Sequence, residues 1–205
     1  QGDSVMLMAS GASAYLWNNN ATTQTIKVKT SGNYKVKVTD ANACSSTSSV
    51  TSVTVNALPQ ATVVASGATV FCQGDSVILT SAYASAYLWN NNATAQSITV
   101  IQSGTYSVKV TGFNGCSATS APNTIIVNTL PVASVTAAGP VNFCNGDSVK
   151  LTAGAAAAYL WNNKETTQSI TVKSSGLYNV ILRDSNGCSA KSADVNINSS
   201  YAPLA

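Results

Sequence analysis

The chain has 205 residues, of which 45% are hydrophobic and only 8% charged, with a net charge of +3 and no histidine. A globular chain usually carries about 25% charged residues; here Ser, Thr and Asn take their place, as in many secreted β-proteins. The basic residues do not form the patch that nucleic-acid binding requires, and no apolar run reaches the roughly 18 residues that span a membrane.

Short runs of alternating apolar and polar residues predict β-strands along the whole chain, and no stretch has helical periodicity. In the middle of the chain, for example, Tyr106, Val108 and Val110 would share one face of a strand. Clusters of Gly, Asn and Ser separate the runs, which is the signature of strands joined by turns. The strands predicted there are 62–65, 76–81, 87–89, 97–100, 105–110 and 124–127. Such spacing is typical of an antiparallel sandwich.

The strands belong to a repeat with a period of 72 residues. Gly-Asp-Ser-Val begins at residues 2, 74 and 146, and Tyr-Leu-Trp-Asn begins at residues 15, 87 and 159. Leu-Pro at residues 58 and 130 follows the last strand of a repeat, and Pro203 takes the third equivalent place. Proline cannot continue a strand ladder, so it marks a short linker. The sequence therefore predicts three modules, 1–57, 58–129 and 130–205, the first of which lacks its first strand and first cysteine.

The cysteines follow the same period. Cys72 and Cys116 stand 44 residues apart, as do Cys144 and Cys188, and each pair flanks the second to fifth predicted strands. If successive strands alternate in direction, both members of a pair lie at one end of the sandwich. We therefore expect a disulfide within each complete module, and an unpaired Cys44. Paired cysteines indicate an oxidising compartment.

Few residues could support catalysis or bind a metal. There is no histidine, Glu165 is the only glutamate, and the recurring Asp3, Asp75 and Asp147 fit turns that lead into strands. We expect no catalytic residue, no cofactor and no zinc site, which would need histidine or a Cys-x-x-Cys pair. A repeated calcium site at Asp40 and Asp184 with the carbonyls of 18–20 is an alternative to an ordinary Asn-rich turn.

One tryptophan per module, Trp17, Trp89 and Trp161, follows a tyrosine by two residues. A fixed place in a strand favours a core role, as in immunoglobulin domains. The alternative is a sugar-stacking platform, which needs exposed rings.

Several motifs of the complete repeat together resemble the immunoglobulin-like, polycystic-kidney-disease-type repeats of Bacteroidetes surface and secreted proteins. They are Cys72-x-Gly74-x-Ser76-Val77, Tyr87-x-Trp89, Ile98-Thr99-Val100, Gly104-x-Tyr106-x-Val108 and Gly115-Cys116-Ser117. The resemblance covers the whole chain and implies tandem antiparallel immunoglobulin-like β-sandwiches, extracellular localisation and export through the type IX secretion system. The Asp-Ser-Val triplets resemble the short O-glycosylation signal of that group, which makes Ser4, Ser76 and Ser148 candidate glycosylation sites. Asn20 and Asn92 begin N-glycosylation sequons, which carry little weight in a bacterial protein.

These features predict a structural or adhesive repeat segment of a large bacterial extracellular surface protein, acting as a semi-rigid stalk or spacer. Expected partners are the neighbouring repeats, and a surface polysaccharide or another cell-surface protein; nucleic acid and membrane insertion are not expected. One alternative is an array of carbohydrate-binding modules attached to a polysaccharide-degrading enzyme. Another is a subunit of an extracellular filament, because a first module without its first strand has an open edge that could accept a strand from a neighbour.

Overall fold

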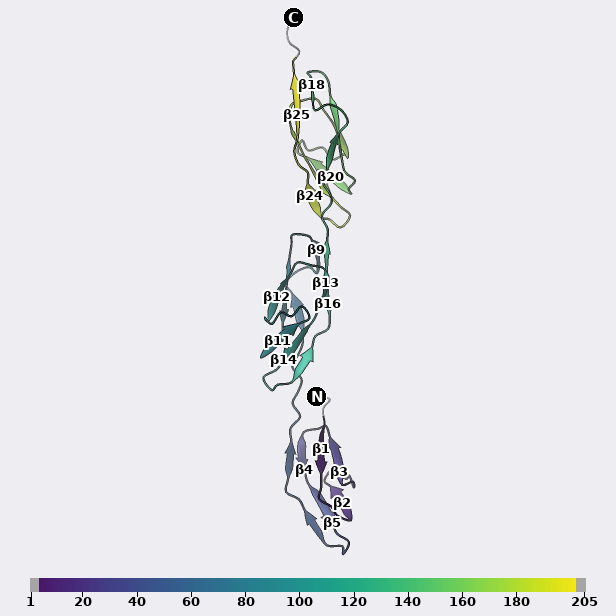
Figure 1. The fold of residues 1–205 in the computed structure, drawn as a ribbon, viewed down its shortest axis with the longest axis vertical. Coiled ribbons are helices and arrows are strands. Elements are labelled where there is room, and N and C mark those ends of the chain that lie inside the picture. Colours follow the sequence, from purple (N-terminus) through teal and green to yellow (C-terminus); the bar gives the residue numbers. More distant parts are fainter. Residues whose placement is uncertain (1–3, 202–205) are drawn as a thin grey trace. The chain divides into compact units, whose positions relative to one another are not determined.

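A computed structural model describes residues 4–201, and within that range the chain forms 25 β-strands and no helix (Figure 1). Asp3 and Pro203 lie outside the described residues. The strands recur with the 72-residue period and alternate between inward and outward side chains. This confirms the expected fold class of tandem antiparallel immunoglobulin-like β-sandwiches.

The first repeat holds seven described strands and the other two hold nine each. Those of the first are β1 (Val5–Met8), β2 (Ala14–Trp17), β3 (Thr25–Val28), β4 (Gly32–Tyr34), β5 (Val36–Thr39), β6 (Ser45–Thr47) and β7 (Thr51–Val53). Those of the second are β8 (Val63–Ala65), β9 (Val70–Cys72), β10 (Val77–Ser81), β11 (Ala86–Trp89), β12 (Ser97–Val100), β13 (Gly104–Tyr106), β14 (Val108–Thr111), β15 (Ser117–Thr119) and β16 (Asn123–Asn128). Those of the third are β17 (Val135–Ala137), β18 (Asn142–Cys144), β19 (Val149–Ala153), β20 (Ala158–Trp161), β21 (Ser169–Val172), β22 (Gly176–Tyr178), β23 (Val180–Arg183), β24 (Ser189–Lys191) and β25 (Val195–Ser200).

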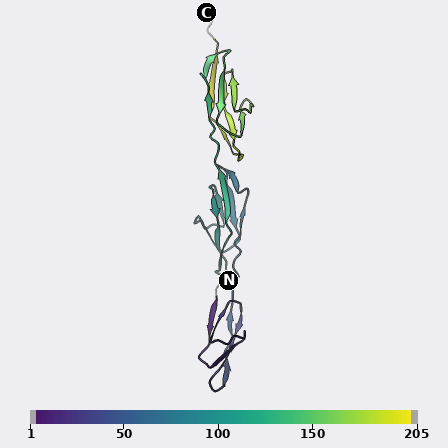
Figure 2. The same cartoon turned by 90° about the vertical axis from the view of Figure 1, so that its right-hand side faces the viewer.

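The third repeat shows the strand order of a complete module. Its sheets are β17-β19-β21, β20-β23-β24 and β18-β25-β22, and all pairs are antiparallel except β18 with β25, which is parallel. The strands run along the length of this module in both views (Figure 1 and Figure 2). The chain changes sheet at Asn179, because β22 pairs with β25 while β23 pairs with β20.

The sequence prediction missed two kinds of strand. The strand predicted over 105–110 is two strands, β13 and β14, which pair with different partners. The short strands β9 and β15 were not predicted at all. Three-residue strands show too little alternation to stand out from the turns beside them.

The core of the third module is built from the inward positions of several sheets. Val149, Leu151, Trp161, Val180 and Leu182 are almost fully buried and pack together. In the first repeat, Trp17, Ile26, Val28, Tyr34 and Val36 form the equivalent cluster.

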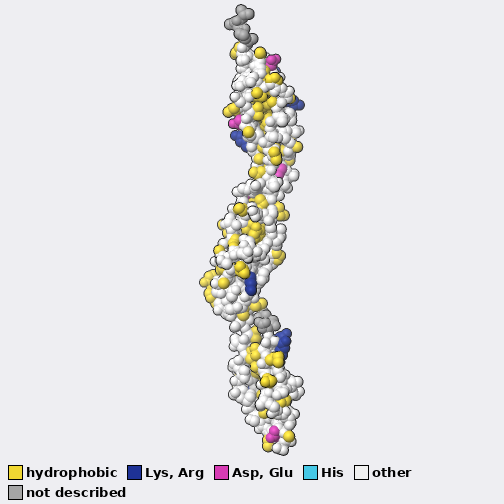
Figure 3. Space-filling model, viewed as in Figure 1, with side chains coloured by type: hydrophobic (Ala, Val, Ile, Leu, Met, Phe, Trp, Pro, Cys, Tyr) yellow, Lys and Arg dark blue, Asp and Glu magenta, His cyan; other side chains and the backbone are white. Residues whose placement is uncertain are grey.

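By its contacts the chain divides into two compact units, and the division runs through the middle repeat. The first unit is Gln1–Thr62, Ala82–Gln96 and Val108–Ala121, and the second is Val63–Ser81, Ser97–Ser107 and Pro122–Ala205. The module boundaries expected near 57/58 and 129/130 thus remain a prediction. No helix of the described residues is long and apolar enough to cross a membrane. Charged side chains are sparse on the face in Figure 3.

We predict that Leu151→Ala destabilises the third module by about 2–5 kcal/mol, because it leaves a cavity in a packed core. Leu151 is wholly buried, whereas Ile181 of the same module is 40% exposed. Hydrogen exchange of the β19 and β21 amides measures the loss. Ile181→Ala is the matched control, and an equal effect of the two variants would contradict the packing.

Candidate functional site

A disulfide between Cys72 and Cys188 joins two repeats and is the best candidate for a functional feature. The two Cα atoms lie 5.6 Å apart, and the bond links residues separated by 116 positions. Cys72 ends β9, where it lies opposite Asn128, the last residue of β16. The N–H of Gln73 donates to the Asn128 carbonyl at 2.8 Å. The bond therefore lies where β16 runs into the linker to the third module.

The other half of the bond lies in the hairpin loop between β23 and β24. The Oδ1 atom of Asp184 accepts the backbone N–H groups of Asn186 and Cys188 at 2.9 and 2.8 Å. Gly187 has φ +86°, a left-handed conformation that glycine adopts at little cost. This side-chain cap holds the loop, and Cys188 is completely buried.

The disulfide pairing expected within modules is wrong. The structure does not join Cys72 to Cys116 or Cys144 to Cys188; Cys116 and Cys144 are free. The expectation assumed strands of alternating direction, but β18 runs parallel to β25, so Cys144 lies opposite Ser200 at the far end of β25. Cys188 lies at the opposite end of this module, before β24 (Figure 1). At about 3.3 Å per residue, the path along β24 and β25 far exceeds the roughly 7 Å that a disulfide allows between Cα atoms.

The hairpin loops of the other two repeats have the same form and free thiols. In the first repeat, Oδ1 of Asp40 accepts the N–H groups of Asn42 and Cys44, each at 2.9 Å, and Cys44 is free and exposed. In the second repeat Gly112 replaces the aspartate, and Oδ1 of Asn114 accepts the Cys116 N–H at 3.1 Å instead.

The loop around Cys116 also touches the linker that precedes its module. The side-chain amide of Asn114 donates to the carbonyl of Ala57 at 2.9 Å. A Cβ atom on Gly112 would lie 3.3 Å from Cβ of Pro59, so the absence of a side chain lets the linker approach closely. The hairpin loop is thus the part of a module that meets what comes before it in the chain.

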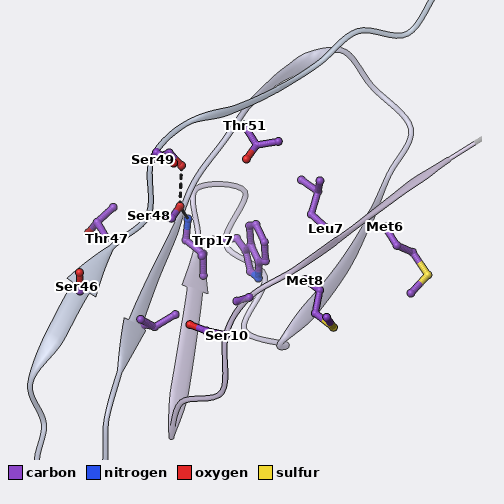
Figure 4. A pocket seen from close by; sticks show the side chains of 13 residues that line it. Met6, Leu7, Met8, Ser10, Trp17, Ser46, Thr47, Ser48, Ser49 and Thr51 are labelled. Carbon is purple, nitrogen blue, oxygen red and sulfur yellow. Dashed lines mark hydrogen bonds between the residues drawn. The ribbon is translucent and has the colours of Figure 1, made fainter.

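The first repeat has an open groove beside β1. Within the described residues β1 pairs with β3 alone, whereas the equivalent strands β10 and β19 have second neighbours, β8 and β17. The groove has a volume of about 420 Å³. Figure 4 shows the side chains of Leu7 and Trp17 between β1 and residues 46–49.

The three tryptophans are core residues, as expected. Trp17, Trp89 and Trp161 are at most 5% exposed, and each indole N–H donates to a carbonyl six residues later at 2.8 or 2.9 Å. The tyrosine two residues before each of them accepts a backbone N–H through its hydroxyl. The repeated Tyr/Trp pair therefore does not form an exposed sugar-stacking platform.

The residues considered for calcium serve as turn and loop caps. Asn20 and Asn92 adopt positive φ in the turn after the tryptophan strand, where the third repeat has Lys164. Asp40 and Asp184 cap hairpin loops through backbone N–H groups. Among the described residues, no three His, Cys, Asp or Glu side chains gather as metal ligands would.

The candidate glycosylation sites differ in exposure. Ser76 and Ser148 are exposed, whereas Ser4 is half-buried. Each of the first two follows a turn in which a glycine, Gly74 or Gly146, has φ above +100°. Their glycosylation stays a prediction.

An exposed aromatic pair in the second repeat was not predicted. Tyr83 and Phe113 are 80% and 73% exposed, and their ring centroids lie 5.6 Å apart. The signal was a departure from the repeat, because the equivalent residues are Gly11 and Ala41 in the first repeat and Ala155 and Ser185 in the third.

No protein-family model and no curated protein sequence matches the chain. Among solved structures it is similar to murine CEACAM1b, with 13% identity and a TM-score of 0.33 over 68% of this chain and 100% of that one. It is also similar to Drosophila OTK extracellular domains 3-5, with 13% identity and a TM-score of 0.39 over 97% and 92%. The outer capsid protein Hoc of bacteriophage RB49 gives 16% and 0.36 over 97% and 95%. The fold assignment rests on the sheet topology and core packing described above.

We predict that digestion without reductant yields a peptide pair joined through Cys72 and Cys188, since these two residues form the bond in the folded chain. Alkylation in denaturant should label three cysteines, Cys44, Cys116 and Cys144. Mass spectrometry of the peptides measures both. A Cys72–Cys116 peptide pair would contradict the structure.

We also predict that Asp184→Ala speeds reduction of the Cys72–Cys188 bond. Two backbone N–H groups would lose their acceptor, at a cost of about 1–3 kcal/mol if they stay unpaired, and the loop that buries Cys188 would open more often. The rate of reduction by dithiothreitol measures the change. Asp184→Asn keeps an acceptor oxygen and should lie close to wild type, and equal rates for all three proteins would count against the cap.

Proposed function

We propose that the chain is a structural or adhesive repeat segment of an extracellular surface protein, acting as a semi-rigid spacer. The single observation that supports this most is the Cys72–Cys188 bond between consecutive repeats. A disulfide persists in an oxidising compartment, which fits an extracellular location. A bond that joins modules, and not the strands of one module, acts on their relative movement.

The bond adds a second covalent connection beside a short linker. The linker of residues 129–134 alone would let the third module pivot about one point. The linker also docks, because the Gly154 N–H donates to the Ser134 carbonyl at 3.0 Å, and an added Cβ on Gly154 would lie 3.0 Å from the Ser134 hydroxyl. In the chain-entropy model, closing a loop of about 100 residues contributes roughly 4–5 kcal/mol. We infer that the junction bends little while the bond is intact.

The finer parts of the proposal rest on motif resemblance. The Cys-x-Gly-x-Ser-Val and Tyr-x-Trp motifs favour a bacterial surface protein of the Bacteroidetes type. Neighbouring repeats would be the first partners, and a surface polysaccharide or another surface protein the distal one. The carbohydrate-binding alternative has lost the feature that motivated it, because Trp17, Trp89 and Trp161 are buried.

A filament subunit is the second candidate function. The unpaired edge of β1 and the groove beside it favour this reading, since an open sheet edge can accept a strand from another chain.

Small-angle scattering of the full chain with its free thiols alkylated tests the spacer proposal. We expect the wild-type protein to give an extended, narrow distance distribution, and Cys188→Ser to broaden it by freeing the junction. Cys72→Ser should behave alike, and Cys144→Ser should change nothing because Cys144 is free. Circular dichroism checks that each variant is folded. A compact particle, or identical profiles for wild type and Cys188→Ser, would overturn the proposal.

A further inference from the structure

The groove beside β1 has the shape that one missing strand would leave. In the second repeat the corresponding place is filled by β8, which pairs antiparallel with β10 in the register Leu79↔Ala65, Thr80↔Val64 and Ser81↔Val63. The third repeat fills it in the same way with β17 on β19. Subtracting the period places Leu7, Met8 and Ala9 opposite such a strand, and all three line the groove.

The side chains under this groove are more exposed than their equivalents. Val5 is 46% exposed, whereas Val77 and Val149 are 2% and 3% exposed. Leu7 is half-buried, whereas Leu79 and Leu151 are wholly buried. The covering strand accounts for the difference, because it lies on the same edge in both repeats where the residues are buried.

A second groove of the first repeat, with a volume of about 200 Å³, matches a second strand. In the other repeats β9 and β18 run parallel to the ends of β16 and β25, with Val70, Phe71 and Cys72 opposite Ile126, Val127 and Asn128. The equivalents of those last three residues, Thr54, Val55 and Asn56, line the second groove. They follow β7, which is shorter than β16 by this stretch.

A free thiol lies at the end of this second groove. Cys116 is half-buried and lines it together with Asn56. Cys116 is the repeat equivalent of Cys188, and a strand of the β9 kind would place its cysteine opposite Asn56, as Cys72 lies opposite Asn128. Two strand grooves and one thiol are thus arranged as the two strands and the bond of the other junction are.

We propose that the first repeat binds, in trans, an extended segment with the residues of Ala61–Cys72, and that Cys116 captures it as a disulfide. The segment's first half pairs antiparallel with β1, with small apolar residues at alternate positions facing Leu7. Its second half runs parallel to residues 54–56. Its terminal cysteine then meets Cys116.

The covalent step is a thiol–disulfide exchange. The segment carries its cysteine as a mixed disulfide with a small aryl thiol. The Cys116 thiolate attacks the segment's sulfur, a bond forms between the two cysteines, and the aryl thiolate leaves with the electron pair. One disulfide replaces another, so no further oxidant is needed.

The experiment uses the full chain and a synthetic peptide, Ala-Thr-Val-Val-Ala-Ser-Gly-Ala-Thr-Val-Phe-Cys, activated as the thiopyridyl disulfide. Mass spectrometry after digestion locates the adduct. We expect Cys116 to react on the order of tenfold or more faster with this peptide than with a scrambled peptide that keeps the terminal cysteine, because docking raises the effective concentration. Cys44 and Cys144 are more exposed than Cys116 and should show no preference between the two peptides.

Two variants keep the test sharp. Met8→Pro puts a residue without an N–H on the β1 edge and should abolish the preference at Cys116. Cys116→Ser should prevent capture but keep non-covalent binding of the peptide, seen as slower hydrogen exchange of β1. Equal rates for the two peptides, or labelling that follows exposure alone, would overturn the proposal. Association of the chain with itself through β1, with no peptide bound, would also overturn it and favour the filament reading; neither outcome changes the scattering test of the junction.

Discussion

The parallel pairing of β9 with β16, and of β18 with β25, is the constraint on which the junction depends. An all-antiparallel sandwich would bring the first cysteine of a module back to the hairpin that holds the second. One parallel strand instead carries it to the end where the chain leaves the module. The disulfide therefore joins a module to the next one, and each module spends its cysteines on its two ends and none on its own core.

The core must then be stable without a bridge of its own. A module of 72 residues buries a limited apolar area, and such small domains are often marginal. Here the tryptophan, with its indole N–H satisfied by a backbone carbonyl, supplies the largest buried side chain, and the strands around it contribute alternate valines, leucines and isoleucines. The hairpin and turn caps use Asp and Asn side chains, which explains why so few charged residues are needed elsewhere.

The sequence was sufficient for the repeat, the strands with clear alternation and the buried role of Trp17, Trp89 and Trp161. It was insufficient for the cysteine pairing, because the direction of a three-residue strand such as β9 leaves no periodic trace, and one reversed strand moves a thiol by the length of the module. The exposed pair Tyr83 and Phe113 was visible as a departure from the repeat, but only the structure shows that the two rings lie together.

The hairpin cap shows how the repeats tolerate change at the junction. Where Gly112 replaces the aspartate of the other two loops, Asn114 takes over the N–H of Cys116, and the glycine leaves room for Pro59. The acceptor has moved by two residues while the cysteine has kept its place. The side chains around the thiol can therefore vary as long as one oxygen still holds its backbone.

The junction bond also gives the array a direction. Its two halves differ, one on a strand end and the other in a hairpin, so a module meets its predecessor and its successor through different surfaces, as in a heterologous assembly. Because every strand and every cysteine keeps a 72-residue offset, duplication or loss of any stretch of 72 residues, wherever its boundaries fall, restores the same neighbours on both sides. Array length can then change by whole periods through simple recombination, with no new interface to be invented.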